Sequence, residues 1–593
     1  MAARLRHLAL SAAALLLTGL LVPTSAAAGS VAGLNVPDST SAPEAARVDA
    51  VPTPVLDWWA CTGGATCATT ELPVDYDDPT GPTTTVAMLK VAATDPAHRI
   101  GTLFLNPGGP GGSGVMLALA APYFLSTTVR QRFDLVGFDP RGTNFSDNIK
   151  CFTTAKDRFD AADGADGYAL PQTTAQQNLT IAYAQRIGPA CAADGLAAHM
   201  STAEVARDMD VLRRAVGDSQ LSYLGFSYGT ALGQYYAAMF PDRVRAVAVD
   251  GVINPVNWVG DAGTPTELDS RLHSGVAAYK ALRRALEVCR LAGKLRCPLA
   301  TQGDPWTQWR YVAAKLRAHP LVLNSPAGAV TVTYGAFVTA ALGELYGATA
   351  YEDVVLLTYL MDVMVRYPRQ RRSAPLVDTL RQKLRSAPLG GGGNIPNDNS
   401  ADWFYGVTCT DAAHPANATD WPTLMATANA NAPYFGEVWG WQNAPCATGT
   451  WTAQDADAYR GPFNKVTEVP VLFVGDAWDP ATSYNSALSA AAASGGWLIR
   501  SNSWGHTAYG TSRCVTQGVD YYLLYRARPS ATVCQGDNRP SWGSSGRSRG
   551  RTERAPTRLD AMKPASVSAV AKQPTGEPSM LPPIAVPALR QLR

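Results

Sequence analysis

The sequence is poor in charge of either sign and has only one long apolar run. Charged residues make up 17% of its 593 residues, and the formal net charge is +2. Such a balance predicts no nucleic-acid partner, because it offers no strongly basic surface. The one long apolar run lies at the N-terminus. The rest of the chain is therefore expected to contain no integral membrane span.

The sequence also lacks any Cys-x-x-Cys pair, although it contains ten cysteines. This absence argues against tetrahedral zinc sites and thioredoxin-like redox chemistry, so we expect neither a metal nor a cofactor. Connectivity does not follow from sequence, but pairing neighbours in order would close only local loops. The working hypothesis is five structural disulfides: Cys61–Cys67, Cys151–Cys191, Cys289–Cys297, Cys409–Cys446 and Cys514–Cys534.

The N-terminal segment has the composition of a signal peptide. A basic lead with Arg4 and Arg6 precedes the apolar run Leu8 to Val22, and small residues follow from Ser25 to Ala28. The run is short for a membrane span. We expect residues 1–28 to be cleaved and the mature protein to be secreted to the extracellular space, where disulfides persist.

Composition divides the rest of the chain into an α/β body, a helical insertion and two terminal segments. Residues 29–54 read as a loose lead. Short apolar runs alternate with helical patterns over 55–253 and return over 466–540, which predicts a mostly parallel sheet with helices on both faces, an α/β fold. Residues 254–465 are dominated by amphipathic helical stretches, which predict a cap inserted over the strand ends.

A basic tail occupies residues 541–593. From Trp542 onward nine Lys and Arg stand against three Asp and Glu, a net of +6. This composition predicts disorder, with contact to the cell wall or another polyanion as a second hypothesis. We expect the protein to be a monomer.

A Gly-x-Ser-x-Gly pentapeptide, Gly225 to Gly229 with Ser227 at its centre, is the clearest chemical motif. It lies between a short apolar run and a helical pattern that ends at Pro241. Strand, tight turn and helix are the context of a nucleophile elbow, in which the glycines allow a strained backbone and close helix–strand packing. The pentapeptide also occurs by chance in glycine-rich chains, so a catalytic role requires the other parts of the machinery.

A candidate acid and base follow this serine in the order that such hydrolases use, acid and then histidine. Of seven histidines, His506 follows a late apolar run, where a loop at the carboxyl edge of a last strand would place it. Asp476 and Asp479 follow the preceding apolar run. Asp479 lies further out in the loop and is the expected acid, with Asp476 as the alternative. Such a triad activates a serine hydroxyl for acyl transfer.

A glycine-rich loop from Asn106 to Gly114 supplies candidate oxyanion donors. Backbone amides there, with Gly109 foremost, and the amide of Tyr228 would face the developing charge. The loop also spells Gly-x-Gly-x-x-Gly, and Asp134 follows it by about 20 residues, which imitates a dinucleotide fingerprint. Three observations argue against a dinucleotide-binding oxidoreductase. Pro110 lies inside the loop, the chain is expected to be exported to a compartment without a nicotinamide supply, and this function would leave Ser227, Asp479 and His506 without a role.

With these parts together, the chain resembles the secreted tripeptidyl aminopeptidases of actinomycetes, α/β-hydrolases related to proline iminopeptidases. The resemblance spans about Leu56 to Pro540, and its motifs are Asn106–Gly114, Phe138-Asp-Pro-Arg-Gly142, Gly225–Thr230, Cys409-Thr-Asp411, and Asp479 with Gly505-His506. Pro107 stands where the proline iminopeptidases carry a histidine, which agrees with the tripeptidyl branch. Asp139 and Arg141 are expected to form a turn and an ion pair beside the site.

The resemblance implies an α/β-hydrolase fold and a serine exopeptidase that releases short peptides, tripeptides by the family's example, from free N-termini. Selecting an N-terminal ammonium requires carboxylates in a partly closed site. We expect Asp411 in this role, with Glu344 and Asp402 as further candidates. The alternatives are a secreted esterase or lipase-type hydrolase acting on non-peptide esters, and a non-catalytic relative that only binds peptides.

Overall fold

The computed structural model describes residues 34–162, 170–261, 263, 266–326, 328–385 and 400–538. The expected signal peptide at 1–28 and the basic tail at 541–593 lie outside these residues. Among the helices of the described ranges, none is both long and apolar enough to cross a bilayer.

A ten-stranded sheet forms the centre of the molecule, in the order β1-β2-β3-β5-β4-β6-β7-β10-β11-β12. Antiparallel pairing is confined to one end of this sheet, where β1 (Trp59–Ala60), β2 (Thr66–Pro73) and β3 (Thr83–Val91) follow one another and β3 also pairs antiparallel with β5. The strands that pair in parallel are β4 (Gly101–Asn106), β5 (Phe133–Phe138), β6 (Leu221–Phe226), β7 (Val244–Asp250), β10 (Leu472–Trp478), β11 (Trp497–Trp504) and β12 (Val533–Cys534). The mostly parallel sheet expected from the continuous apolar runs is therefore confirmed.

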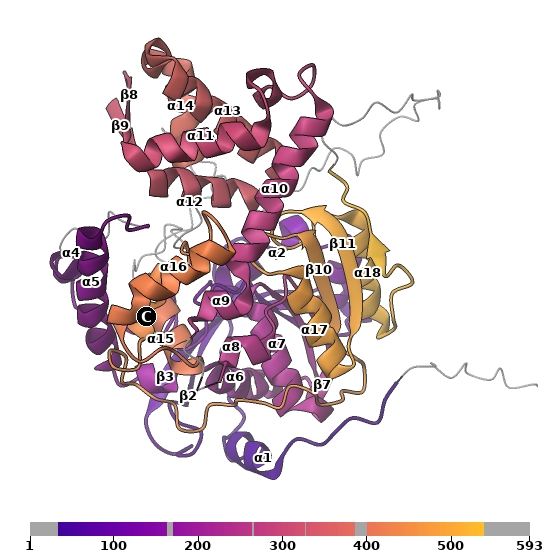
Figure 1. The fold of residues 1–593 in the computed structure, drawn as a ribbon. Coiled ribbons are helices and arrows are strands. Elements are labelled where there is room, and N and C mark those ends of the chain that lie inside the picture. Colours follow the sequence, from indigo (N-terminus) through magenta and orange to yellow (C-terminus); the bar gives the residue numbers. More distant parts are fainter. Residues whose placement is uncertain are drawn as a thin grey trace, which may run out of the picture.

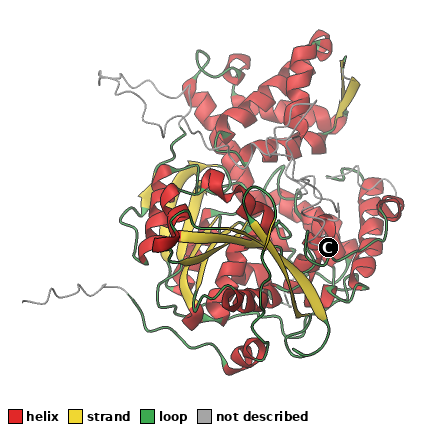
Figure 2. Cartoon of the chain, turned by 180° about the vertical axis from the view of Figure 1, so that it is seen from behind, coloured by secondary structure: helices red, strands yellow, loops and turns green. Residues whose placement is uncertain are grey.

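Helices cover both faces of this sheet (Figures 1 and 2). One face packs against α2 (Gly114–Phe124), α3 (Thr127–Arg132) and α18 (Arg513–Tyr525). The other packs against α6 (Thr202–Ala215), α7 (Tyr228–Met239) and α17 (Tyr484–Ser494). Each face of the sheet therefore has its own apolar core. Because both faces are packed, the strand ends where the site forms are held in place.

The segment between β7 and β10 is mostly helical, and a large part of it has a third apolar core. Its elements are α8 (Pro255–Val259), α9 (Leu268–Leu272), α10 (Ser274–Ala292), α11 (Pro305–Ala318), a hairpin of β8 (Leu321–Ser325) and β9 (Gly328–Val332), α12 (Tyr334–Leu345), α13 (Ala350–Arg366), α14 (Ala374–Arg385), α15 (Ser400–Asp411) and α16 (Trp421–Asn431). Figure 1 shows α10 running from α9, beside the sheet, up to the group formed by α11 to α14.

The cap layer also recruits helices from outside the segment expected for it. The chain between β5 and β6 contributes α4 (Ala155–Ala162) and α5 (Thr174–Ala192). Ile181 and Ala184 of α5 belong to the apolar core of the cap. The composition of 55–253 did not reveal this, because an amphipathic helix shows that it has an apolar face but not which layer covers that face.

The lead before the body is more ordered than its composition predicts. It contains α1 (Ala42–Asp49), which begins at Ser41, whose hydroxyl accepts from the Glu44 N–H. Val48 is fully buried, and Glu44 pairs with Arg207 at 2.9 Å. A capped helix with one anchoring apolar residue and a buried ion pair holds this segment on the body.

The Asp139–Arg141 turn does not form the expected ion pair. Arg141 is fully buried and donates two hydrogen bonds to Asp208, at 2.6 and 2.8 Å. Asp139 instead accepts from the Ser113 hydroxyl at 2.7 Å and from the Val115 N–H at 3.0 Å. The two residues therefore anchor different helices, α6 and α2.

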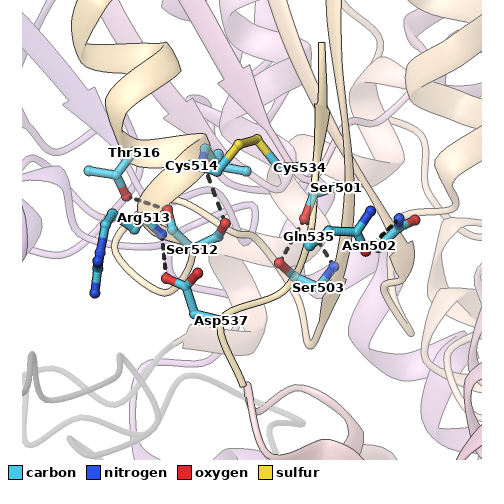
Figure 3. Close-up of a disulfide and its surroundings, with 11 residues drawn as sticks. Ser501, Asn502, Ser503, Ser512, Arg513, Cys514, Thr516, Cys534, Gln535 and Asp537 are labelled. Carbon is cyan, nitrogen blue, oxygen red and sulfur yellow. Dashed lines mark hydrogen bonds between the residues drawn. A yellow bond between two sulfur atoms is a disulfide. The ribbon is translucent and has the colours of Figure 1, made fainter. Parts of the chain in front are cut away.

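Five disulfides pair the cysteines in the order expected along the chain, namely Cys61–Cys67, Cys151–Cys191, Cys289–Cys297, Cys409–Cys446 and Cys514–Cys534. Figure 3 shows the last of these between the start of α18 and β12. Nearby, the Arg513 N–H donates to Asp537 at 2.6 Å. The end of the described chain is thus tied to the sheet edge.

Candidate active site

Ser227 lies at the turn between β6 and α7, with φ 55° and ψ −125°. A positive φ is strained for a residue with a Cβ and persists only where the surroundings enforce it. Here the Ser227 N–H donates to the Asp250 carbonyl at 3.0 Å, the Thr230 hydroxyl donates to the Ser227 carbonyl, and the Tyr223 hydroxyl donates to the Gly229 carbonyl at 2.7 Å. These bonds hold the serine at the sharp turn that the pentapeptide predicts.

Close contacts explain the glycines around this serine. A Cβ on Gly225 would lie 2.4 Å from the Gly229 carbonyl oxygen, and one on Gly229 would lie 2.6 Å from Asn106 Oδ1. A Cβ on Gly108 would lie 2.7 Å from the Tyr228 nitrogen. The glycine-rich loop after β4 therefore packs directly on the elbow, which is the use that a hydrolase makes of it.

The two residues expected to supply oxyanion amides, Gly109 and Tyr228, lie near Ser227. Gly109 and Ser227 line the same pocket. Tyr228 is the first residue of α7, so its N–H has no partner within the helix and lies at the positive end of the helix dipole. Asn106 Oδ1 accepts the Gly108 N–H at 2.8 Å and orients the facing loop. The arrangement offers amide donors to a negative charge that develops beside Ser227.

The imidazole of His506 contacts the carboxylate of Asp479. His506 Nδ1 lies 2.8 Å from Asp479 Oδ2. The other oxygen, Oδ1, accepts from the N–H groups of Ala481 at 2.8 Å and Thr482 at 2.9 Å, and the Thr482 hydroxyl donates to Oδ2 at 2.8 Å. Asp479 is only 2% exposed, so these donors hold its charge and its direction.

The environment of His506 suits it to act as a base. Burial alone would lower the pKa of His506, but the charge and hydrogen bond of Asp479, with the charge of Asp250, raise that pKa above its ordinary value. The Tyr346 ring meets the imidazole edge-on at 5.2 Å between centroids, and the Tyr346 carbonyl accepts the backbone N–H of His506 at 3.0 Å. With Nδ1 turned to Asp479, Nε2 is left to accept a proton.

Asp476 is not the partner of His506. Among the hydrogen bonds of the described ranges, His506 bonds to Asp479 and not to Asp476. Asp476 is 1% exposed, and its backbone lies in register with Ser501 of β11. Burial and the charge of Asp250 raise the pKa of Asp476 well above its ordinary value.

Asp250, at the end of β7, is a site residue that the sequence reasoning missed. Its carboxylate accepts the N–H groups of Ala508 at 2.9 Å and Tyr509 at 2.7 Å, and so holds the loop after His506. Burial, which these bonds partly offset, raises the pKa of Asp250 to about 6. An acid at the end of a continuous apolar run was the available signal, because such a position falls at the edge where the site forms.

A pocket of about 90 Å³, partly open to solvent, is lined in part by Ser227. The body and the cap both supply its walls. The lining includes Gly109, Pro110, Ser227 and Thr482 from the body and Trp258, Leu268, Asp269, Ser274, Tyr346, Phe404, Trp439 and Gln442 from the cap. With Val252, Ile253, Leu272 and Ala481, which also line the pocket, apolar side chains form most of its wall. The fewer polar groups are placed to orient a bound molecule.

Asp269 is the acidic residue in the wall of this pocket. It lies in α9 next to Glu267, whose carboxylate accepts the N–H groups of Asp269 at 2.8 Å and Ser270 at 2.7 Å. Asn443 Nδ2 donates to Asp269 Oδ2 at 2.6 Å. Burial and the neighbouring charge of Glu267 raise the pKa of Asp269 well above its ordinary value, although Arg271 offsets part of this effect. Two close carboxylates of this kind favour a bound cation.

Two of the acids expected to bind an ammonium are engaged elsewhere. Asp402 is fully buried and pairs with Arg158, and Glu344 pairs with Lys383 at 3.0 Å. Neither is among the residues that line the pocket. The structure therefore does not support these two acids as ammonium ligands, because an ion pair outside the pocket offers nothing to a substrate.

Asp411, the first candidate for that role, is also enclosed. The residue is 1% exposed, and its carboxylate accepts from the Thr202 N–H at 3.1 Å and from Trp258 Nε1 at 2.6 Å. It does not line the pocket, although Trp258 does. The Asp411 carboxylate is engaged by these donors, and Asp269 is the acidic side chain that the pocket presents.

Comparisons with known proteins match both halves of the body. The family model described as α/β hydrolase fold matches residues 101–272, and that described as TAP-like protein matches residues 432–534. The tripeptidyl aminopeptidase of Streptomyces coelicolor is 29% identical over 486 residues, which cover 79% of this chain and 84% of that protein. Serine protease Hip1 of Mycobacterium tuberculosis is 29% identical, and carboxylesterase B of the same species is 31% identical; each match covers 79% of this chain and 86% of the relative.

Proposed function

Because this serine hydrolase belongs to the tripeptidyl aminopeptidase-like family of α/β-hydrolases, we propose that it is a secreted aminopeptidase that releases short peptides, tripeptides among them, from free N-termini. The observation that carries the proposal is the acid Asp269 in the wall of a pocket that also contains Ser227, with the buried carboxylate of Glu267 behind it. A general esterase has no use for buried acids at that place.

In this proposal Ser227 is the nucleophile. His506 accepts the proton of the Ser227 hydroxyl through Nε2 as Oγ attacks the peptide carbonyl, and Asp479 stabilises the imidazolium that forms. The amides of Gly109 and Tyr228 stabilise the oxyanion. His506 then protonates the leaving amine, which departs as the shortened peptide. Water, activated by the same imidazole, hydrolyses the acyl-enzyme and releases the N-terminal fragment.

The N-terminal ammonium of the substrate binds at Asp269 in the same proposal. Its arrival replaces the repulsion between the Asp269 and Glu267 carboxylates with a charge-assisted hydrogen bond. Asn443 keeps Asp269 turned to the ammonium through the bond at 2.6 Å. The separation between this site and Ser227 then sets how many residues lie between the amine and the scissile bond.

Tripeptide anilides with free and acetylated N-termini test the proposal. The free substrate is expected to be cleaved and the acetylated one to be resistant, because acetylation removes the ammonium. Asp269→Asn is expected to raise KM for the free substrate by about ten- to a hundred-fold, since a charged hydrogen bond is worth roughly 1.5–3 kcal/mol.

Asp402→Asn is the matched control, a buried cap carboxylate outside the pocket, and is expected to leave KM unchanged. Equal rates on both anilides would refute the aminopeptidase proposal. If a fluorophosphonate does not label Ser227 in the wild-type protein, the non-catalytic peptide-binding alternative is favoured instead.

An esterase acting on non-peptide esters is the second candidate. The relative named carboxylesterase B and the apolar walls of the pocket favour it. It predicts that short acyl esters are hydrolysed faster than any free tripeptide anilide and that Asp269→Asn leaves their KM unchanged.

Secretion is supported by the five disulfides, which an oxidising compartment preserves. The N-terminal sequence of protein recovered from culture medium tests it, with a start near Gly29 expected. A mature protein that retains residues 1–28 would contradict cleavage of the signal.

A further inference from the structure

The carboxylate of Asp411 ends a buried hydrogen-bonded chain that reaches the elbow. Asp411 is the last residue of α15 in the cap, and Thr202 is the first residue of α6 in the body. The Thr202 N–H donates to Asp411 Oδ1 at 3.1 Å, and the Thr202 hydroxyl donates to Oδ2. Trp258 Nε1 donates to the same Oδ2 at 2.6 Å. One cap carboxylate thus collects three donors, all of them buried.

The number of protons on each hydroxyl determines which group donates each hydrogen bond in this chain. The Tyr228 hydroxyl lies 2.6 Å from Thr202 Oγ1. A threonine hydroxyl has one proton, and here that proton goes to the charged acceptor Asp411. The Tyr228 hydroxyl must therefore donate to Thr202. The chain runs from Tyr228 through Thr202 to Asp411, and Trp258 meets it from the other side.

Both ends of this chain belong to the catalytic surroundings. Tyr228 follows the nucleophile and supplies one of the proposed oxyanion amides, and Trp258 lines the pocket. Their rings pack at 5.2 Å from centroid to centroid. The strained elbow needs outside anchors, and the Tyr228 hydroxyl is one that is linked to the cap through Thr202.

We propose that Asp411 is a positioning residue that links the seating of the cap to the geometry of the oxyanion site. Its carboxylate fixes the Tyr228 side chain through Thr202 and fixes the pocket wall through Trp258. When the cap is seated, the amide of Tyr228 points at the oxyanion position; when Asp411 is withdrawn, the elbow loses this anchor. The inference rests on acyl transfer at Ser227, as proposed above.

Asp411→Asn tests the inference against a merely structural role. Asp402→Asn is the matched control, because both residues are buried carboxylates of α15, and Asp402 bonds instead to Arg158 and to the Cys151 N–H. Asp411→Asn is expected to lower kcat by about ten- to a hundred-fold, the range that a misplacement of roughly 1 Å produces. Asp402→Asn is expected to keep the wild-type kcat even if its melting temperature falls.

A double-mutant cycle identifies the route. Tyr228→Phe removes only the hydroxyl and is expected to lower kcat, and Tyr228→Phe combined with Asp411→Asn is expected to cost no more than Asp411→Asn alone. Tyr235→Phe, in the same helix, is the control, because the Tyr235 hydroxyl has no hydrogen-bond partner among the described residues. Additive losses would overturn the inference, since Asp411 would then act without Tyr228.

The cycle remains decisive if Asp411→Asn fails to fold. Tyr228→Phe keeps the carboxylate and its other donors, so a folded Tyr228→Phe with wild-type kcat would overturn the inference by itself. The rate at which a fluorophosphonate labels Ser227 gives a second readout, expected to fall in parallel with kcat. If Ser227→Ala retains hydrolysis, the proposed function fails; if activity depends on Ser227 but not on Tyr228 or Asp411, only this inference fails.

Discussion

Replacing Gly251 with alanine should displace the imidazole of His506 and slow the proposed reaction without unfolding the protein. Gly251 follows β7 with φ +73°, and a Cβ there would lie 3.0 Å from His506 Cε1 and 2.9 Å from Thr507 Cγ2. Ordinary carbon contacts are about 3.5–4.0 Å, so the imidazole must shift by roughly 0.5 Å or more. Since about 1 Å of misplacement costs on the order of a hundred-fold in rate, we expect kcat to fall by about ten-fold.

The same substitution has a cost in stability that must be separated from the catalytic effect. An alanine at positive φ costs about 1–2 kcal/mol. Gly217→Ala is the matched control, because Gly217 has φ +85° and a Cβ there would have nothing within 4 Å. Both variants should lose similar free energy of unfolding in urea, while only Gly251→Ala should lose kcat on a tripeptide anilide. A folded Gly251→Ala with the kcat of the control would refute the argument that the ring sits against this backbone.

Three further predictions concern charge and cross-linking. His506 must be neutral to act as a base, and Asp479 raises the pKa of His506. kcat/KM should therefore fall as the pH drops through a value above the ordinary histidine pKa, and Asp479→Asn should move this acidic limb to lower pH. A limb that stays in place would contradict the pairing of His506 with Asp479. Because the pKa of Asp269 is raised, protons should compete with the substrate ammonium for its carboxylate. KM for a free tripeptide anilide should therefore rise with acidity more steeply in the wild type than in Asp269→Asn. Parallel profiles of KM against pH would contradict the ammonium site. Replacing Cys514 and Cys534 together by alanine opens a loop with a sequence separation of 20 and should reduce the free energy of unfolding by about 3 kcal/mol with kcat unchanged, whereas a large loss of kcat would show that this edge bears on the site.

The sequence was most informative where local chemistry decides the structure. The elbow at Ser227 follows from its two flanking glycines, because only glycine allows the approach of Gly229 to Asn106. The fold class follows equally directly, since continuous apolar strands separated by helices leave few alternatives to a covered parallel sheet. The acid and the histidine could be placed at strand ends because the order of such residues along the chain is shared by these hydrolases.

The sequence was least informative where burial depends on packing between layers. Asp269, Asp402 and Asp411 are all acids on helices of the cap, and nothing in their local patterns distinguishes a pocket wall from an enclosed network. The partner of Arg141 was missed for the same reason, because Asp208 is distant in sequence and comes close only when α6 packs on the sheet. The role of Asp250 could not be predicted either, because its carboxylate bonds to Ala508 and Tyr509, which are distant in sequence and follow another strand of the body.

The products formed from a linear peptide, identified by mass spectrometry, test the central claim most directly. With a free N-terminus, the peptide should yield a short N-terminal fragment and the complementary shortened peptide, and Ser227→Ala should yield neither. The same peptide with an acetylated N-terminus should remain intact. Internal cleavage of both peptides at equal rates, or the same fragments from Ser227→Ala, would contradict a serine aminopeptidase.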